Sequence, residues 1–418
     1  MRVLVVSWEY PPVVVGGLGR HVDALSRELA SLGHDVTVLT RHPTGTDATS
    51  HPTACDSSGP VRVLRVAEDP PLLEFGRDLV AWTLAWNHAA LRAALVRLGN
   101  WRPEVVHAHD WLAAHAGIGL ADVFDVPLVA TVHATEAGRN AGRLETPLQR
   151  QIHSVEWWLA RRADALVTCS QAMRAEVARL FAPDAPIAVV PNGIVPRRWA
   201  VDAEQVATVR RRWAPGGGPL LVNLGRLEYE KGVQDLLAAL PRIRQRCAGT
   251  RLVVVGTGTQ AAMLAEAARG YGVDGAVTFA GHVPDDDLAA TLAAADVVVL
   301  PSRYEPFGIV ALEVAAAGAP LVAARTGGLA EVVGDDAGLS FPPGDVDALA
   351  DAVVRTLGDP DAAARRVARA RARLTTDFDW ARIAARTAEV LRAAQRRPPV
   401  ALGRPTIASG DLLGAPEH

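Results

Sequence analysis

The chain has 418 residues, a hydrophobic content of 49% and a formal net charge of -3. This length exceeds what one hydrophobic core usually organises, so we expect two domains. So weak a charge gives no electrostatic reason to expect nucleic acid or an anionic membrane as the main partner. The three cysteines, Cys55, Cys169 and Cys247, are odd in number and far apart. They indicate neither a disulfide framework nor a metal-ligand spacing, and we expect reduced thiols in the cytoplasm.

The amino-terminal segment has the pattern of a βαβ unit. The apolar run that ends at Ser7 is too short for a signal peptide or a membrane span, and it predicts a buried strand over residues 3–7. We then expect a glycine-rich turn over residues 11–19, a helix over residues 21–30 and a second strand over residues 35–40.

The glycine-rich turn is a candidate phosphate-binding loop. At Gly16, Gly17 and Leu18 the backbone can approach a ligand closely, and the helix start that follows attracts a diphosphate. The spacing differs from the G-x-G-x-x-G pattern of dinucleotide-binding proteins, which disfavours a dehydrogenase. For the glycines alone, a merely flexible loop is an equally good explanation.

Polar side chains follow two further predicted strands of the first half. One strand leads to Asp110, and the next, over residues 126–133, delivers His133 at its carboxyl end. A histidine at the end of a strand is more often a satisfied structural group than a functional one. We assign His107 to that structural class and leave His109 open.

Several intervening segments are predicted from composition and periodicity. Residues 44–60 are rich in Ser, Thr, Pro and Gly and indicate a mobile excursion, whereas residues 72–98 read as a helix. Glu136 and Arg139 lie in a polar loop that could line a cleft. Residues 196–218 are polar, end in three glycines and are the predicted linker between the two domains.

The second half again alternates strands and helices, as expected for a second parallel sheet. The predicted strands cover residues 220–225, 251–255, 277–281, 296–300 and 320–324, with a glycine loop over 326–331 and helices over 307–317, 345–357, 362–374 and 378–395. The tail over residues 396–418, which holds several prolines and glycines, is expected to be disordered.

Two cations follow the first strand of this half. Arg226 and Lys231 lie where the predicted strand over residues 220–225 gives way to a helix. Cations at such a place can neutralise the charge that grows on a departing diphosphate. The alternative is a pair of solvated surface charges. Their position between a buried strand and Gly232 favours the functional interpretation.

The segment around Glu305 combines the features of a sugar–nucleotide site. Glu305 follows the strand over residues 296–300, at the carboxyl end where open α/β sheets bind ligands. Pro306 is expected in the first turn of the next helix, which Gly318 ends. The helix start is a candidate anion site through the backbone amides of Phe307, Gly308 and Ile309. Glu313 lies on the same apolar helix, where a carboxylate is costly unless it is hydrogen-bonded.

These motifs resemble those of the retaining glycosyltransferases of family 4, the glycogen-synthase-like group. The resemblance rests on Glu305-x7-Glu313, on Gly225-Arg-x4-Lys-Gly232, on the His-Ala-His-Asp-Trp motif at 107–111 and on Pro-Asn-Gly-Ile at 191–194. It implies the α/β GT-B fold, in which two Rossmann-like domains with parallel sheets face a central cleft. The expected domains are 1–196 on the acceptor side, completed by the crossover helix 378–395, and 197–377 on the donor side.

The resemblance also implies roles for individual residues. Glu305 would contact the transferred sugar and steady its positive charge, His133 would hydrogen-bond that sugar, and Asp110 would lie beside the acceptor. The donor would be held by two cations, the ribose-binding carboxylate and the two phosphate loops: Arg226, Lys231, Glu313, Gly16, Gly17, Leu18, Phe307, Gly308 and Ile309. No metal and no other cofactor is expected.

The expected reaction is transfer of glucose from ADP-glucose or UDP-glucose to an α-1,4-glucan, with retention of configuration. Segments 8–12, 228–232 and 304–308 resemble those of the α-1,4-glucosyltransferases of methylglucose lipopolysaccharide synthesis, which implies a polymethylated polysaccharide acceptor. The sequence leaves other readings open: another family 4 hexosyl- or mannosyltransferase, a GT-B sugar-nucleotide epimerase or hydrolase, and a non-catalytic sensor. It gives no preference between ADP and UDP and no oligomeric state.

Overall fold

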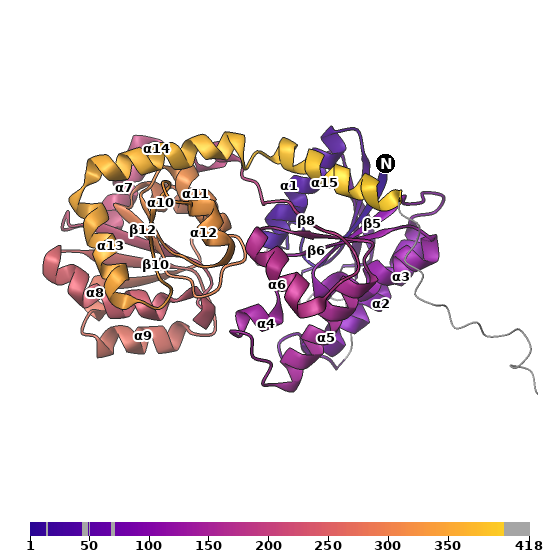
Figure 1. Cartoon of the computed structure of the whole chain (residues 1–418), viewed down its shortest axis with the longest axis horizontal. Coiled ribbons are helices and arrows are strands. Elements are labelled where there is room, and N and C mark those ends of the chain that lie inside the picture. The colour runs from indigo at the N-terminus through magenta and orange to yellow at the C-terminus, as the bar shows by residue number, and fades with distance from the viewer. Residues whose placement is uncertain (14–15, 44–48, 50, 68–71, 397–418) are drawn as a thin grey trace, which may run out of the picture.

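Two β-sheets, each covered by helices, organise the two halves of the chain. The computed structural model describes residues 1–13, 16–43, 49, 51–67 and 72–396. Figure 1 shows the two halves side by side, joined along one edge by the last two helices. The predicted α/β fold with two parallel-sheet domains is confirmed.

The first sheet is built from eight strands among the described residues. They are β1 (Arg2–Ser7), β2 (Asp35–Arg41), β3 (Ala54–Ser58), β4 (Val61–Val66), β5 (Val105–His109), β6 (Leu128–Val132), β7 (Ala165–Thr168) and β8 (Ile187–Val189). Their order is β3-β4-β2-β1-β5-β6-β7-β8. All neighbours are parallel except the edge pair β3 and β4. β5 and β6 are buried along their whole length.

The second sheet is built from six strands in the same part of the chain. They are β9 (Leu220–Leu224), β10 (Arg251–Val255), β11 (Val277–Gly281), β12 (Val297–Leu300), β13 (Leu321–Ala324) and β14 (Leu339–Phe341). Their order is β11-β10-β9-β12-β13-β14, and every neighbouring pair is parallel. The short edge strand β14 was not predicted.

Helices cover both sheets (Figure 1). Those of the first half are α1 (Gly17–Ser31), α2 (Leu79–Arg97), α3 (Ala114–Phe124), α4 (Glu136–Arg139), α5 (Pro147–Arg162) and α6 (Gln171–Phe181). Those that follow are α7 (Ala203–Trp213), α8 (Val233–Arg246), α9 (Ala261–Gly270), α10 (Asp285–Ala293), α11 (Ile309–Ala317), α12 (Gly327–Val333), α13 (Val346–Gly358), α14 (Pro360–Thr376) and α15 (Trp380–Gln395). None of the described helices combines the length and the apolar character needed to cross a membrane.

Strand order determines where ligands can bind. In the first sheet β1 lies between β2 and β5, and in the second β9 lies between β10 and β12. At such points the connections leave on opposite sides of the sheet, and a crevice opens at the carboxyl ends of the strands. The loops after β1, β5, β9 and β12 carry most of the residues that the sequence singled out.

The last helix returns to the first half of the molecule. α14 runs along the second half, whereas α15 packs against α1 (Figure 1). Trp380 at the start of α15 is buried over Gly193, where a Cβ atom would lie 2.6 Å from the indole. Glycine is therefore needed at 193 for this close approach. The boundary between residues 196 and 197 remains a prediction.

Three predictions about the connecting segments were wrong. The predicted linker, 196–218, contains a 3₁₀ turn over Pro196–Trp199 and the helix α7, which Asp202 and Gln205 begin with a reciprocal capping box. The predicted excursion contains strand β3, which pairs antiparallel with β4. The predicted loop over 326–331 is largely helix α12. Residues 44–48 and 50 of the excursion, and 397–418 of the tail, lie outside the described residues.

Candidate active site

Glu305 and Lys231 meet between two loops of the second half. Glu305 lies in the loop after β12, and Lys231 ends the 3₁₀ turn Tyr229–Lys231 after β9. Lys231 Nζ donates to Glu305 Oε2 at 2.6 Å, with both side chains largely but not fully buried. The amides of Arg303 and Tyr304 bind the carbonyl oxygen of Glu230, which ties the two loops together. The predicted catalytic carboxylate and one predicted diphosphate cation are therefore direct partners.

Lys231 carries a sequence feature that the motif analysis missed. It is the only lysine among the 43 lysine and arginine residues of the chain. The next residue, Gly232, has φ +72°, and a Cβ atom there would overlap the carbonyl oxygen of Pro301. Glycine thus lets the loop that carries Lys231 lie directly against the loop that carries Glu305.

Arg226, the second predicted diphosphate cation, is more exposed than Lys231. Its guanidinium binds Glu230 Oε1 at 2.8 Å, and the arginine side chain is 45% exposed. The two cations therefore have separate acidic partners. The guanidinium is open to solvent, whereas the side chain of Glu230 is only 13% exposed, so a phosphate would compete with Glu230 for Arg226.

The start of α11 differs from the prediction by two residues. The helix begins at Ile309 after Gly308, which has φ +99° and cannot be part of a right-handed helix. Pro306 and Phe307 therefore belong to the loop, and Pro306 is not in the first helical turn. Gly318, with φ +84°, ends the helix as predicted.

The two predicted phosphate loops lie against each other where the two halves of the chain meet. A Cβ atom on Gly17 would lie 2.6 Å from Cδ1 of Ile309, so the start of α1 faces the start of α11. The amides of Gly16 and Gly19 donate to Glu9 Oε2 at 3.2 and 3.3 Å. A carboxylate thus already occupies the helix start where the sequence predicts a diphosphate, and Leu18 lies in the same turn of α1.

Glu313 is buried, and its partner comes from the other half of the chain. Burial raises the pKa of Glu313 to about 7, and Arg20 opposes that rise. Arg20, on α1, donates to Glu313 Oε1 at 3.1 Å and to Asp285 Oδ1 at 2.8 Å. The sequence analysis missed Arg20, although it directly follows the glycine-rich turn. The predicted ribose ligand is therefore held by an ion pair between the two halves.

Asp110 and His133 lie together at the carboxyl edge of the first sheet. Asp110 Oδ1 accepts the amide hydrogen of His133 at 2.7 Å, and Asp110 itself has φ +58°. Burial raises the pKa of Asp110 to about 6 and lowers the pKa of His133 to about 4. His109 Nδ1 lies 3.1 Å from His133 Nε2, so His109, left open from the sequence, belongs to this cluster. His107 is fully buried and contacts Thr131 Oγ1 at 2.7 Å, as a structural histidine would.

Tyr304 links the two halves beside Glu305. Its hydroxyl oxygen lies 2.8 Å from Glu176 Oε1 and accepts the amide hydrogen of Thr135 at 3.3 Å. A Cβ atom on Gly138 would overlap its ring, so glycine is needed for this approach. Because Thr135 is two residues after His133, the contact joins the loops of two predicted catalytic residues.

We expect Tyr304→Phe to lower kcat/KM by roughly tenfold. A hydrogen bond to a charged group contributes about 1.5–3 kcal/mol, and its loss would loosen the alignment of the two loops. Steady-state kinetics on Tyr304→Phe would measure the effect, with exposed Tyr271→Phe as the matched control. Equal kinetics for the two variants would contradict a positioning role for the hydroxyl.

Glu136 and Arg139 form the short helix α4 rather than a loop, and a buried carboxylate holds its start. Glu156 Oε1 accepts the amide hydrogen of Glu136 at 2.8 Å. Burial raises the pKa of Glu156 from 4.5 to about 8, against the lowering effect of that hydrogen bond. Glu156 thus orients the segment that follows His133.

The raised pKa of Glu156 predicts a pH dependence of stability. In the folded chain the Glu156 carboxyl group keeps its proton at pH values where the same group in the unfolded chain has lost it. The associated stability is fully present below about pH 4.5 and is lost as the pH rises through about 8. The melting temperature of the wild type should therefore fall as the pH rises, and Glu156→Gln should make this fall less steep. Glu389→Gln, which changes an exposed carboxylate, should leave it as it is. Parallel profiles for the wild type and Glu156→Gln would contradict the assignment.

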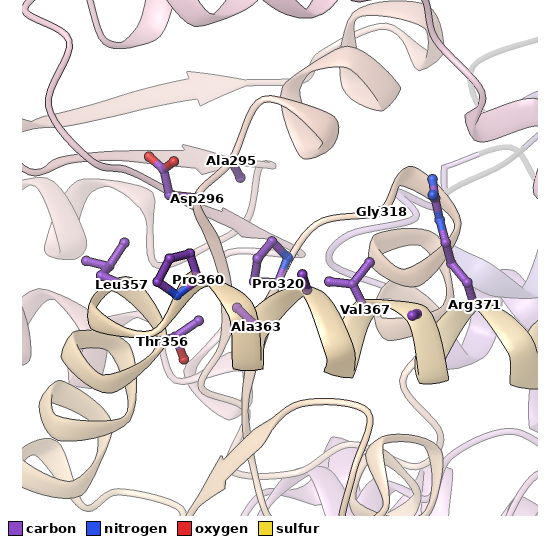
Figure 2. Close-up of a pocket in the computed structure, with 12 residues that line it drawn as sticks. Ala295, Asp296, Gly318, Pro320, Thr356, Leu357, Pro360, Ala363, Val367 and Arg371 are labelled. Carbon is purple, nitrogen blue, oxygen red and sulfur yellow. The ribbon is translucent and has the colours of Figure 1, made fainter.

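A cavity of about 630 Å³ lies away from these residues, beneath α14 (Figure 2). Leu357, Pro360 and Val367 give it an apolar wall, with Asp296 and Arg371 at its ends (Figure 2). None of the predicted site residues lines it. The candidate site is therefore defined by the converging loops and not by this cavity.

Comparison with known proteins identifies the family. Residues 15–198 match the domain described as Glycosyltransferase Family 4, and residues 207–373 match the domain described as Glycosyl transferases group 1. The chain is 52% identical over 404 residues to the glycogen synthase of Mycobacterium tuberculosis, covering 95% of each protein. It is 31% identical over 405 residues to the GDP-mannose-dependent alpha-(1-6)-phosphatidylinositol monomannoside mannosyltransferase of the same species, covering 94% of this chain and 98% of the relative.

A solved structure agrees with these matches. Sucrose-phosphate synthase from Thermosynechococcus elongatus superposes with a TM-score of 0.78 at 26% identity, covering 94% of this chain and 98% of that one. The family predicted from the paired glutamates is confirmed by the sequence matches, and the architecture by the superposition. The chain belongs to the family 4 glycosyltransferases and has their GT-B fold.

Proposed function

We propose that the chain is a retaining glucosyltransferase that moves glucose from ADP-glucose or UDP-glucose to an α-1,4-glucan. The observation that carries this proposal is the contact between Glu305 and Lys231 where β9 and β12 end, opposite the loops of the first sheet. The identity of 52% with a protein named glycogen synthase supports glucose as the sugar and a glucan as the acceptor. The finer resemblance to methylglucose lipopolysaccharide synthesis adds a polymethylated polysaccharide as a second acceptor class.

In the proposed reaction, the bond between the anomeric carbon and the diphosphate oxygen breaks. Lys231 and Arg226 neutralise the charge that develops on the leaving diphosphate, together with amides at the start of α11. Glu305 stabilises the positive charge on the sugar. The acceptor hydroxyl oxygen forms the new bond on the same face, and the departing phosphate takes its proton.

The remaining site residues would hold the substrates. Glu313 would bind the ribose, whose hydroxyls would replace the guanidinium of Arg20. The neutral ring of His133 would form a hydrogen bond with the sugar, and Asp110 beside it would face the acceptor. The contacts between the two halves would exclude water, which is needed to suppress hydrolysis of the donor.

We expect the reaction to need no divalent metal. The positive charge for the diphosphate comes from Lys231, Arg226 and backbone amides, which do the work that a metal does in other nucleotide-sugar enzymes. Full turnover in EDTA is the predicted result. Loss of turnover in EDTA that magnesium or manganese restores would contradict it.

Product analysis tests the function and its alternatives together. The chain is incubated with ADP-glucose, UDP-glucose and GDP-mannose, each with and without α-glucan acceptors, and proton NMR gives the anomeric configuration of the product. Elongation with a retained α-linkage from a glucose donor is expected. Transfer of mannose alone would assign a mannosyltransferase, and free sugar released equally without acceptor would assign a hydrolase. A changed sugar still attached to the nucleotide would assign an epimerase.

A further inference from the structure

Three imidazoles from separate elements converge in the first half of the molecule. His21 comes from α1, His109 from the end of β5 and His133 from the loop after β6. One ring nitrogen of each lies within 4.8 Å of the others. The rings of His21 and His133 have centroids 4.7 Å apart. The proposed reaction has a role for His133 but none for His21.

The cluster contains buried nitrogen atoms without hydrogen bonds. Neither ring nitrogen of His21 reaches a partner of acceptable geometry among the described residues. On His109 the unpaired nitrogen is Nε2, whereas Nδ1 is the nitrogen that faces His133. Asn192 is close enough to His21 to raise its pKa, although burial has the larger, lowering effect. Buried polar atoms are normally paired, and unpaired ones often mark an ion or water that the protein binds.

We propose that His21, His109 and His133 form a site for a zinc-like divalent cation, which inhibits sugar transfer when it binds. Neutral imidazoles are preferred ligands of such ions, whereas Mg²⁺ and Ca²⁺ require oxygen ligands. The inhibition, but not the binding, rests on the proposed function, because a metal bound to His133 would hold the ring that the proposed reaction uses to bond the sugar.

The geometry needs only a small adjustment. Zinc–nitrogen bonds of about 2.0–2.1 Å in a tetrahedral arrangement place two ligand nitrogens about 3.3 Å apart. His109 Nδ1 and His133 Nε2, 3.1 Å apart, already match this distance. The ligand nitrogen of His21 lies no more than 4.8 Å from the other two, so it would have to approach them by at most about 1.5 Å. The three imidazoles leave a fourth position for water or for a substrate oxygen.

Charge and access also favour a cation here. His21 and His109 are buried, so a cation bound to their rings would be shielded from competing water. The carboxylate of Asp110, bonded to the amide of His133, supplies nearby negative charge. His133 is only half-buried, which gives the ion a way in.

A cobalt titration of the full chain tests the binding directly. Co²⁺ takes the ligand sets of Zn²⁺ and absorbs visible light strongly when fewer than six ligands bind it. One equivalent is expected to give this spectrum, and one equivalent of Zn²⁺ should abolish it. His21→Gln should weaken Co²⁺ binding at least tenfold. The control is His51→Gln, which should leave the affinity unchanged, because His51 is the exposed member of a separate pair with His42. Unchanged affinity in His21→Gln would overturn the site.

Two further measurements keep the test decisive if His21→Gln does not fold. X-ray absorption of the zinc-loaded wild-type chain should reveal three imidazole ligands, and fewer than three would overturn the proposal. Zn²⁺ should also inhibit sugar transfer reversibly, with activity restored by EDTA. Tight binding without inhibition would overturn the inhibitory role alone. If no donor is turned over at all, the proposed function fails, while the spectra still decide whether the metal site exists.

Discussion

Glu305→Gln is expected to lower turnover by roughly 10²–10³, the usual scale for deleting one preorganised electrostatic group. The substitution keeps the shape of the side chain and removes the charge that would stabilise the sugar cation. Donor affinity should change far less, because the diphosphate and ribose would be held by Lys231, Arg226 and Glu313. The variant also removes the charge partner of Lys231, whose ammonium group donates to Glu305 in the wild type. Steady-state kinetics and donor binding on one preparation would separate these effects.

The competing explanation is that Glu305 is structural. Asp351→Asn is a suitable control, because it also removes a carboxylate from ion pairs, here with Arg242 and Arg246 on the surface. A structural Glu305 would contribute about 0.3–1 kcal/mol, as carboxylates near helix starts do, and its loss would lower the melting temperature without slowing the folded enzyme. A stable Glu305→Gln variant with near wild-type turnover would end the catalytic assignment.

Lys231→Met is expected to reduce kcat/KM by a similar factor, roughly 10²–10³. It removes the cation that would neutralise the diphosphate, and it leaves Glu305 without its partner in a largely buried place. A carboxylate in that position repels the incoming phosphates, so both donor affinity and turnover should fall. Kinetics with the nucleotide sugar at several concentrations would measure the two effects.

Arg246→Met provides the matched control for Lys231→Met. Arg246 also loses one ion pair, with Asp351, but on an exposed surface. Lys231→Arg should restore part of the activity, because the charge returns with a different shape. Equal kinetics for Lys231→Met and Arg246→Met would contradict a role for Lys231 in binding the diphosphate.

Local patterns predicted the elements around the site well. The apolar run before Pro301 and the glycine at 318 bracket β12, the turn with Glu305 and α11 to within two residues. The two-residue error at the start of α11 has a simple cause. Gly308 adopts φ +99°, and a sequence cannot distinguish a glycine that breaks a helix from one that lies within it.

Contacts between the halves could not be predicted in the same way. Arg20 and its partner Glu313 are 293 residues apart in the sequence, and Tyr304 and its partner Glu176 are 128 residues apart. Periodicity reports only which face of an element is apolar, and it contains no information about the residue opposite. The contact of Glu9 with the start of α1 is local, but it was missed as well, because periodicity does not show which group a carboxylate binds.

Two other features were not predicted, although the sequence contains a signal for each. Helix α7 lies in a polar segment, but Asp202 and Gln205 have the spacing of a capping box, and Val209 and Trp213 form its buried face. The single lysine of an arginine-rich chain is a second such signal. Both depend on counting residues and spacings rather than on hydrophobic periodicity.

The single lysine also allows the most direct test of the central claim, that Lys231 and Glu305 form the donor site. Reductive methylation with ¹³C-formaldehyde labels one lysine side chain and the amino terminus, and it keeps the positive charge. We predict that the Lys231 resonance shifts saturably with ADP-glucose or UDP-glucose, at concentrations that match the KM, and that Glu305→Gln changes its starting position. A chain that turns over either nucleotide sugar while this resonance stays unmoved would contradict the account.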